Sequence, residues 1–219
     1  MIYNDPELVH TLQQVLEVLG TFAFAISGIR HAAAKHFDWF GGYVCGVAVA
    51  IGGGTIRDLI LGVAPFWTTD IRYLLFTGLA LILTVAFRKA MKQLDNAWFV
   101  FDTLGLAFFT IAGMQKTLEL GHPFWLAIVM GCMTGVAGGV IRDVILNNVP
   151  VIFHKEIYAI ASIAGGFIYW ALYVLGFSLP TVAISTFLVI CLTRFIAVYY
   201  HITLPILHDE EEKNDEKNC

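Results

Sequence analysis

The sequence predicts an all-α integral membrane protein, with seven transmembrane helices arranged as two inverted three-helix repeats plus one extra helix. Hydrophobic residues make up 58% of the 219 positions and charged residues only 14%, a balance far from that of soluble domains. Apolar stretches of about 20 residues, the length needed to cross a bilayer, recur along the chain. A long motif also occurs twice, and its spacing defines the repeats.

Seven apolar stretches are the predicted membrane-spanning helices. Their connections, about 5 to 10 residues each, leave no room for a soluble domain. The first stretch follows acidic residues and precedes no small-residue cleavage pattern, so we expect it to remain as a helix and not to be removed as a signal peptide. The predicted spans are residues 12–30, 39–63, 71–88, 97–115, 124–147, 157–176 and 180–202.

The C-terminal block "HDEEEKNDEKNC" is too charged and too short to bury a core, so we expect residues 205–219 to form an acidic, disordered cytoplasmic tail. The net charge of −4 comes largely from this tail and therefore does not indicate nucleic-acid binding. The four cysteines lack the spacing of a disulfide framework or a metal site. No catalytic constellation is visible, so we expect neither an enzyme nor a bound cofactor.

The distribution of lysine and arginine predicts the orientation in the cell (inner) membrane, because cytoplasmic loops carry the excess of positive charge. With seven spans, the side of the N-terminus carries only Arg72 and Lys116. We therefore expect the N-terminus outside and the C-terminus in the cytoplasm. The basic residues on the predicted cytoplasmic side are Arg30, Lys35, Arg88, Lys89, Lys92, Lys155, Lys213 and Lys217.

The segment "AIGGGTIRDLILGVAP" returns later as "GVAGGVIRDVILNNVP", so that Arg142 follows Arg57 by 85 residues. Chance similarity between apolar helices would not keep glycines, a charge pair and a proline in register. We therefore divide the chain into a first repeat (1–92), a second repeat (93–178) and an unpaired seventh helix (179–204). Other pairs at this offset are Glu17 with Asp102, Gly20 with Gly105, Phe24 with Phe109, Pro65 with Pro150 and Tyr73 with Tyr158.

Each copy contains three spans, an odd number, so the second copy must enter the membrane from the opposite side. This predicts an inverted repeat about an axis in the membrane plane. Such proteins often place the functional path at the repeat interface, where glycine-interrupted helices in corresponding positions indicate it. Here those helices are the second and the fifth.

The glycine runs of these two helices allow two interpretations. They could interrupt the helices and turn backbone carbonyls toward a permeating cation, which lipid tolerates only beside protein or a water-filled cavity. They could instead only let helices pack closely, as small residues do in membranes. Their presence in both copies favours the first interpretation. The residues are Gly52, Gly53, Gly54, Gly138 and Gly139.

The pairs Arg57–Asp58 and Arg142–Asp143 lie within predicted spans, where charges are costly and are functional candidates by default. A structural alternative is a capping box from Thr55 to Asp58, although the second copy lacks the threonine. At about 1.5 Å per residue the two arginines should lie toward opposite faces. We therefore expect each half to satisfy its own charges.

Three other embedded polar groups are weaker candidates. Glu17 and Asp102 could line a vestibule, or their carboxylates could reach the interface near a helix end, which we prefer. We expect Arg194 to extend to the cytoplasmic interface in the same way. A small basic patch should attract anionic membrane lipids: Arg30, His31, Lys35 and His36.

The motifs "GGGTIRDLILG" and "AGGVIRDVIL", set in two three-span repeats with a seventh span, closely resemble the prokaryotic branch of the trimeric intracellular cation (TRIC) channel family. The resemblance covers about residues 12 to 202. It implies a homotrimer with one pore in each subunit, conducting monovalent cations with potassium as the main ion. It also implies that the second and fifth helices bend at their glycine motifs beside the pore. Related prokaryotic sequences have been labelled as glycine transporters.

The sequence therefore favours a potassium channel that could also pass sodium, with no nucleic-acid partner and no metal site. The alternative is a secondary transporter of a small amino acid such as glycine, built on the same repeats. A carrier needs a midplane pocket for a carboxylate, whereas a channel needs a continuous path with few strong sites. The predicted ion pathway comprises Gly52, Gly53, Gly54, Arg57, Asp58, Gly138, Gly139, Arg142 and Asp143.

Overall fold

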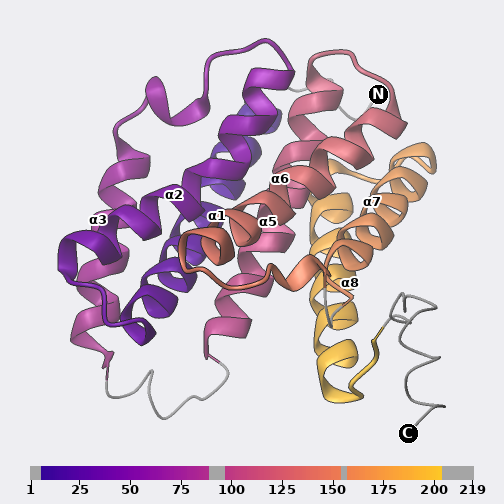
Figure 1. Cartoon of the computed structure of the whole chain (residues 1–219). Coiled ribbons are helices and arrows are strands. Elements are labelled where there is room, and N and C mark those ends of the chain that lie inside the picture. The colour runs from indigo at the N-terminus through magenta and orange to yellow at the C-terminus, as the bar shows by residue number, and fades with distance from the viewer. Residues whose placement is uncertain (1–5, 89–96, 154–156, 204–219) are drawn as a thin grey trace, which may run out of the picture.

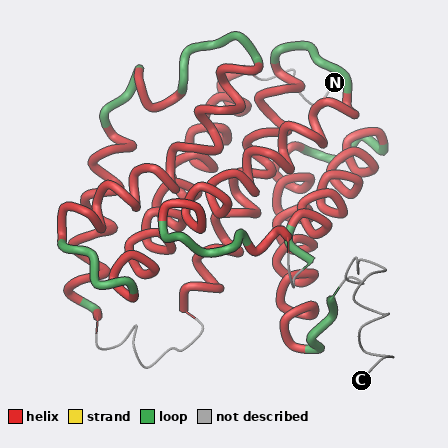
Figure 2. Tube along the Cα trace, in the orientation of Figure 1, coloured by secondary structure: helices red, strands yellow, loops and turns green. Residues whose placement is uncertain are grey.

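The structure is a computed structural model that describes residues 6–88, 97–153 and 157–203. Within these residues it is all helical, with seven α-helices and no strand (Figure 1 and Figure 2). This confirms the predicted all-α class, and the described α-helices match the predicted spans in number. The α-helices are α1 (Pro6–Ala34), α2 (Trp39–Ile60), α3 (Arg72–Ala86), α5 (Ala97–Glu119), α6 (Phe124–Ile145), α7 (Ala159–Val174) and α8 (Leu179–Tyr199).

Five of these helices are long and apolar enough to cross a membrane: α1, α2, α5, α6 and α8. The other two, α3 and α7, have 15 and 16 residues, which is about 22 to 24 Å of helix against a hydrocarbon core of about 30 Å. The predicted spans 71–88 and 157–176 therefore extend past the ends of these two helices. The connections before these helices contain short 3-10 helices, η1 (Phe66–Thr68) and η2 (Val151–Phe153).

Corresponding helices of the two repeats run antiparallel where they touch. Gln115, near the end of α5, donates its side-chain amide to the carbonyl of Val9, near the start of α1, at 2.7 Å. At the other end the rings of His31 and Trp98 meet with centroids 5.2 Å apart. The α2–α3 and α5–α6 connections lie at the same end of the molecule, at the top of Figure 1. This arrangement supports the inverted relationship that the odd number of spans predicts.

The glycine motifs lie where α2 and α6 cross, and the prediction that they interrupt these helices is wrong. Both helices continue through their glycines without a break. A Cβ atom on Gly53 would collide with the carbonyl oxygen of Thr134, and one on Gly138 would lie 2.7 Å from that of Val49. The missing side chains therefore allow two backbones to touch, and the backbone carbonyls stay within the helices.

An aromatic contact in the buried core joins the two repeats. The rings of Phe24 and Phe109, at equivalent positions, stack with centroids 5.5 Å apart and planes inclined by 16°. A Cβ atom on Gly20 would lie 2.9 Å from the Phe109 ring, and one on Gly105 would strike the Phe24 ring. Glycine at both positions is therefore what lets α1 and α5 approach around these rings.

The seventh helix, α8, packs against α7 and α5. Its Arg194 is fully buried, so the prediction that this side chain extends to the interface is wrong. Neighbouring aromatic rings and a carboxylate provide a place for the guanidinium inside the protein, as described below. The predicted acidic tail, residues 205–219, lies outside the described residues.

Candidate ion pathway

An arginine and two carboxylates of the first repeat form a buried cluster. Arg57 on α2 donates from Nε to Asp58 Oδ1 and from Nη2 to Glu17 Oε1 on α1, both at 2.8 Å. Tyr73 on α3 donates its hydroxyl to Glu17 Oε2 at 3.0 Å. The second carboxylate oxygen of Asp58 accepts from the backbone amide of Phe66 at 2.8 Å. Three helices and η1 therefore meet on this cluster.

The second repeat builds the equivalent cluster. Arg142 on α6 donates from Nε to Asp143 Oδ1 at 2.8 Å and from Nη1 to Asp102 on α5. Tyr158 donates its hydroxyl to the same Asp102 oxygen at 3.4 Å. The other oxygen of Asp143 accepts from the amide of Val151 at 3.1 Å. Each of these residues follows its counterpart in the first repeat by 85 positions, so the contacts are duplicated together with the sequence.

Each cluster also receives a fourth charge, from a different source. Lys116, near the end of α5, places Nζ 3.0 Å from Asp58 Oδ1. Arg194 on α8 places Nη2 3.7 Å from Asp102 Oδ2. Counted over the described residues, each cluster then contains two carboxylates and two cations and is neutral. This matters because an uncompensated charge in a low-dielectric interior is strongly destabilising, whereas a neutral, hydrogen-bonded set is tolerated.

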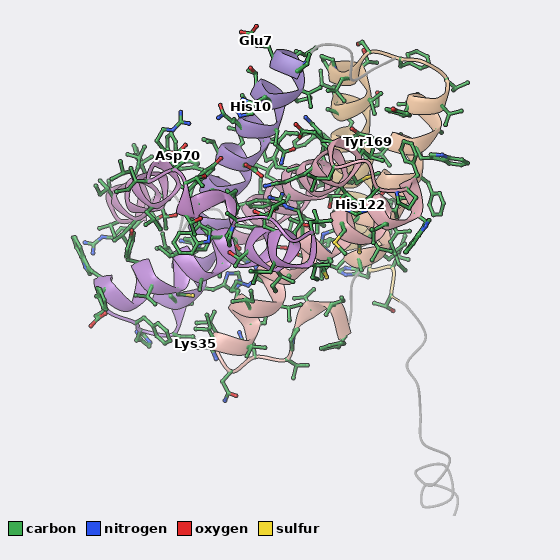
Figure 3. All side chains as sticks on the ribbon, turned by 90° about the horizontal axis from the view of Figure 1, so that it is seen from above. Glu7, His10, Lys35, Asp70, His122 and Tyr169 are labelled. Carbon is green, nitrogen blue, oxygen red and sulfur yellow. The ribbon has the colours of Figure 1, made fainter. Side chains whose placement is uncertain are left out.

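A polar cavity of about 460 Å³ opens beside the first cluster. Glu17, Phe66 and Tyr73 connect it to the cluster, and three carboxylates but only one lysine lie along its wall. Figure 3 shows two wall residues, His10 and Asp70, coming from different elements, with Lys35 at the far end of α1. The lining consists of His10, Gln13, Gln14, Glu17, Ala64, Phe66, Thr69, Asp70, Tyr73, Lys116, Glu119 and Leu120.

Asp70, between η1 and α3, keeps its negative charge at the wall of this cavity. Arg72 donates to its carboxylate from Nε at 2.6 Å and from the backbone amide at 2.9 Å. The hydrogen bond from the Arg72 side chain is the main cause that lowers the pKa of the Asp70 carboxyl below its usual value. The carboxylate therefore stays ionised throughout the physiological pH range.

The described residues leave little space beside the second cluster. The small pocket beside it is bordered by Gly139, Arg142, Asp143, Val151 and Tyr158 and has no room for a water molecule. A Cβ atom on Gly139 would lie 2.7 Å from the Tyr158 hydroxyl, so this glycine lets the tyrosine reach the cluster. In the described part of the chain, a cavity of about 460 Å³ therefore borders the first cluster, whereas the pocket that borders the second has no room for water.

The predicted charged residues fall into these clusters. The expectation that each half satisfies its own charges holds for the carboxylate partners of both arginines, but Lys116 of the second repeat pairs with Asp58 of the first. Arg142 also donates from Nη1 to Ser27 Oγ on α1 at 3.0 Å.

Glu17 and Asp102, expected to reach the interface, are instead the main partners of Arg57 and Arg142. Both carboxylates are buried together with the arginines that they bind. Their equal spacing of 40 residues from the arginines was the signal that could have revealed the pairing.

The capping alternative for Thr55 is wrong, because α2 continues through this residue. Its hydroxyl donates to the carbonyl of Ile51 at 2.7 Å and accepts from the Trp67 indole at 2.9 Å.

The other two glycines of the first motif, Gly52 and Gly54, also pack closely, against Ile141 and Phe66 respectively. Among the described residues, no group of three or more His, Cys, Asp or Glu side chains is placed to hold a metal ion.

The sequence also matches known proteins. The family model described as Glycine transporter matches residues 14–89 and 99–174, two matches that begin 85 residues apart. The UPF0126 inner membrane protein YadS of Escherichia coli is 38% identical over 194 residues, which cover 87% of this chain and 93% of that protein. A UPF0126 membrane protein of Vibrio cholerae is 37% identical over 206 residues, covering 92% and 85% respectively.

The fold matches solved structures over most of the chain. The TRIC trimeric intracellular cation channel orthologue from Rhodobacter sphaeroides aligns with a TM-score of 0.83 and 30% identity, covering 88% of this chain and 100% of that one. A further prokaryotic TRIC channel aligns with a TM-score of 0.81 and 29% identity, covering 89% and 100%. These relatives are membrane channels and not enzymes. The chain therefore belongs to the family described as Glycine transporter, the UPF0126 membrane proteins, and has the fold of the prokaryotic TRIC cation channels.

Proposed function

We propose that this protein is a monovalent cation channel, with potassium as its main ion and sodium as a second one. It works as a homotrimer with one pore in each subunit. The observation that carries the proposal is the acidic cavity that ends on the first charge cluster, in a chain 30% identical to a cation channel orthologue of the same fold. The proposed orientation in the inner membrane places the N-terminus outside and the C-terminus in the cytoplasm.

The charges of the cavity favour cations. Its wall holds the carboxylates of Glu17, Asp70 and Glu119 against the single ammonium of Lys116. A cleft of one sign with low-dielectric walls concentrates counter-ions of the other sign. Behind the wall, Arg57 is compensated by two carboxylates, so its positive charge does not repel an entering cation.

We propose that the pathway continues between α2 and α6 and is closed in this structure. The helices touch at Gly53 and Gly138, where a backbone carbonyl of the partner helix fills the place of a side chain. A small separation of α2 and α6 at these glycines would open a path lined by backbone instead of bulky side chains. The pathway then runs past Arg57 and Asp58, between the glycines, and past Arg142 and Asp143.

A carrier of a small amino acid such as glycine is the second candidate. The cavity wall holds a cation, Lys116, and carboxylates such as Glu17, a combination that suits a zwitterion. The side-chain oxygen of Gln13 on the same wall is buried and has no hydrogen-bond partner among the described residues, so it could accept from an ammonium group.

Recordings of the purified protein in planar bilayers with asymmetric KCl separate the two functions. A channel gives unitary current steps whose reversal potential follows the potassium gradient. A carrier gives no steps, and proteoliposomes then take up labelled glycine with saturation. Bilayers without protein are the control. A silent bilayer together with saturable glycine uptake would overturn the channel proposal.

A further inference from the structure

The fourth charge of the second cluster comes from the one helix that has no counterpart in the repeats. Arg194 on α8 is fully buried, and its guanidinium carbon lies 4.9 Å from the ring centroid of Phe99 and 4.7 Å from that of Tyr158. Its Nη2 lies 3.7 Å from Asp102 Oδ2. Two aromatic faces and a carboxylate hold it, which is an arrangement that suits the planar guanidinium.

The two clusters differ mainly in this fourth charge. At the first cluster it is Lys116, whose flexible side chain is 19% exposed and borders the water-accessible cavity. At the second cluster it is Arg194, with no exposed surface. The other contacts correspond, except that Glu17 stands where the second cluster has Asp102 and that Arg142 also donates to Ser27 Oγ at 3.0 Å. The presence of the cavity therefore coincides with the difference between a partly exposed lysine and a buried arginine.

We propose that Arg194 is a positioning residue that keeps the second cluster dry and closed, so that the pathway opens to water at the first cluster alone. Without the guanidinium, Asp102 and Asp143 would share the single cation of Arg142. The cluster would carry one net negative charge, and it would draw in water or a cation. The consequence for conduction rests on the proposed channel function, whereas the closure of the cluster does not.

Hydrogen exchange of two equivalent amides tests this closure inside one molecule. Val151 donates its amide to Asp143, and Phe66 donates its amide to Asp58. The ratio of the Val151 rate to the Phe66 rate reports opening of the second cluster relative to the first. We expect Arg194→Met in the full chain to raise this ratio at least tenfold, measured by exchange mass spectrometry with fragmentation to single residues.

Three further variants distinguish a positioning role of Arg194 from a general effect on packing. Arg194→Lys keeps the charge but not the planar stacking, so the ratio should rise less than with methionine. Adding Asp102→Asn to Arg194→Met restores neutrality, and the ratio should return toward the wild-type value. Lys35→Met, at an exposed position beyond the C-terminal end of α1, should leave it unchanged. An unchanged ratio in Arg194→Met, or equal acceleration of both amides, would overturn the proposal.

The potassium current of Arg194→Met provides a second, separate test. If the protein is a channel, Arg194→Met should raise the potassium current several-fold, because one of the two closures is then lost. A wild-type protein that gives no current at all counts against the channel function, and the amide ratio then decides on the closure by itself. A raised ratio with an unaltered current overturns the role of Arg194 in conduction.

Discussion

Arg57 and Arg142 hold their charges in the same way in the two halves of the molecule. Each donates Nε to the aspartate that follows it and a terminal nitrogen to a carboxylate 40 positions earlier. The arginines link the second helix of each repeat to the first. Breaking either set leaves an uncompensated charge in the interior, so both should be sensitive to neutral substitutions.

Replacing Glu17 by glutamine should destabilise the protein by about 3–5 kcal/mol, because it leaves the buried Arg57 with one carboxylate fewer. Asp102→Asn should have a similar effect in the second half. Thermal unfolding in detergent measures both. The matched control is Glu119→Gln, at an exposed position on the cavity wall, where the cost should be close to zero. Equal melting temperatures for Glu17→Gln and this control would contradict the burial of the ion pair.

Alanine at Gly53 or Gly138 should push α2 and α6 apart, because the new methyl group meets a backbone carbonyl that cannot move aside. Overpacking of this kind costs roughly 1–3 kcal/mol. Gly42→Ala, in α2, is the control, since its methyl group would meet only Leu81 at 3.9 Å. The control should be neutral or slightly stabilising, as alanine favours helix. If all three variants melt alike, the helices do not cross at these glycines.

Removal of the Lys116 charge should strengthen the attraction of the cavity for cations. In Lys116→Met the wall keeps its carboxylates and Asp58 loses one of its two cationic partners. If the protein is a channel, we expect the potassium concentration at half-maximal conductance to fall several-fold in bilayer recordings. Lys35→Met, at an exposed position beyond the other end of α1, should leave it unchanged. A higher half-maximal concentration would contradict the assigned role of Lys116.

The Asp70–Arg72 pair should set the acid limit of this attraction. The pKa of the Asp70 carboxyl is lowered, so its negative charge is present at neutral pH and is lost only as the pH falls through that lowered value. In Arg72→Met the pKa should return toward the ordinary aspartate value of 3.8, and the charge should disappear at a higher pH. Current against pH, recorded between pH 3 and 7, should therefore begin to fall at a higher pH in the variant. Superimposable curves would show that Asp70 does not act on the entering ion.

The amino-acid pattern predicted the helices, the duplication and the local compensation of both arginines, because hydropathy and a constant offset are properties of the chain itself. The packing of the glycines could not be predicted. A glycine in an apolar run is equally compatible with a broken helix and with a close crossing, and only the position of Thr134 and Val49 decides between them.

The fourth charges were also beyond sequence reasoning. Lys116 belongs to the second repeat but serves Asp58 of the first, a contact that depends on how α5 lies across α2. Arg194 has no counterpart at the repeat offset, so the duplication gave no indication of its partner. In a span of this hydropathy, an arginine near the end extends to the interface by default. The rotation of α8 about its axis turns Arg194 toward Asp102 and not toward the interface, and the sequence does not determine this rotation.

The stacked rings of Phe24 and Phe109 have an evolutionary consequence. In a dimer of two identical three-helix chains inserted in opposite directions, this phenylalanine would have met its own copy on the twofold axis. A single mutation would then have altered both rings at once. Fusion of two such copies into one chain would have ended that restriction, and here both fourth charges, Lys116 on α5 and Arg194 on α8, come from residues after the first repeat. A cavity beside one cluster, with no room for water in the pocket beside the other, is a difference that a symmetric dimer of such chains could not have had.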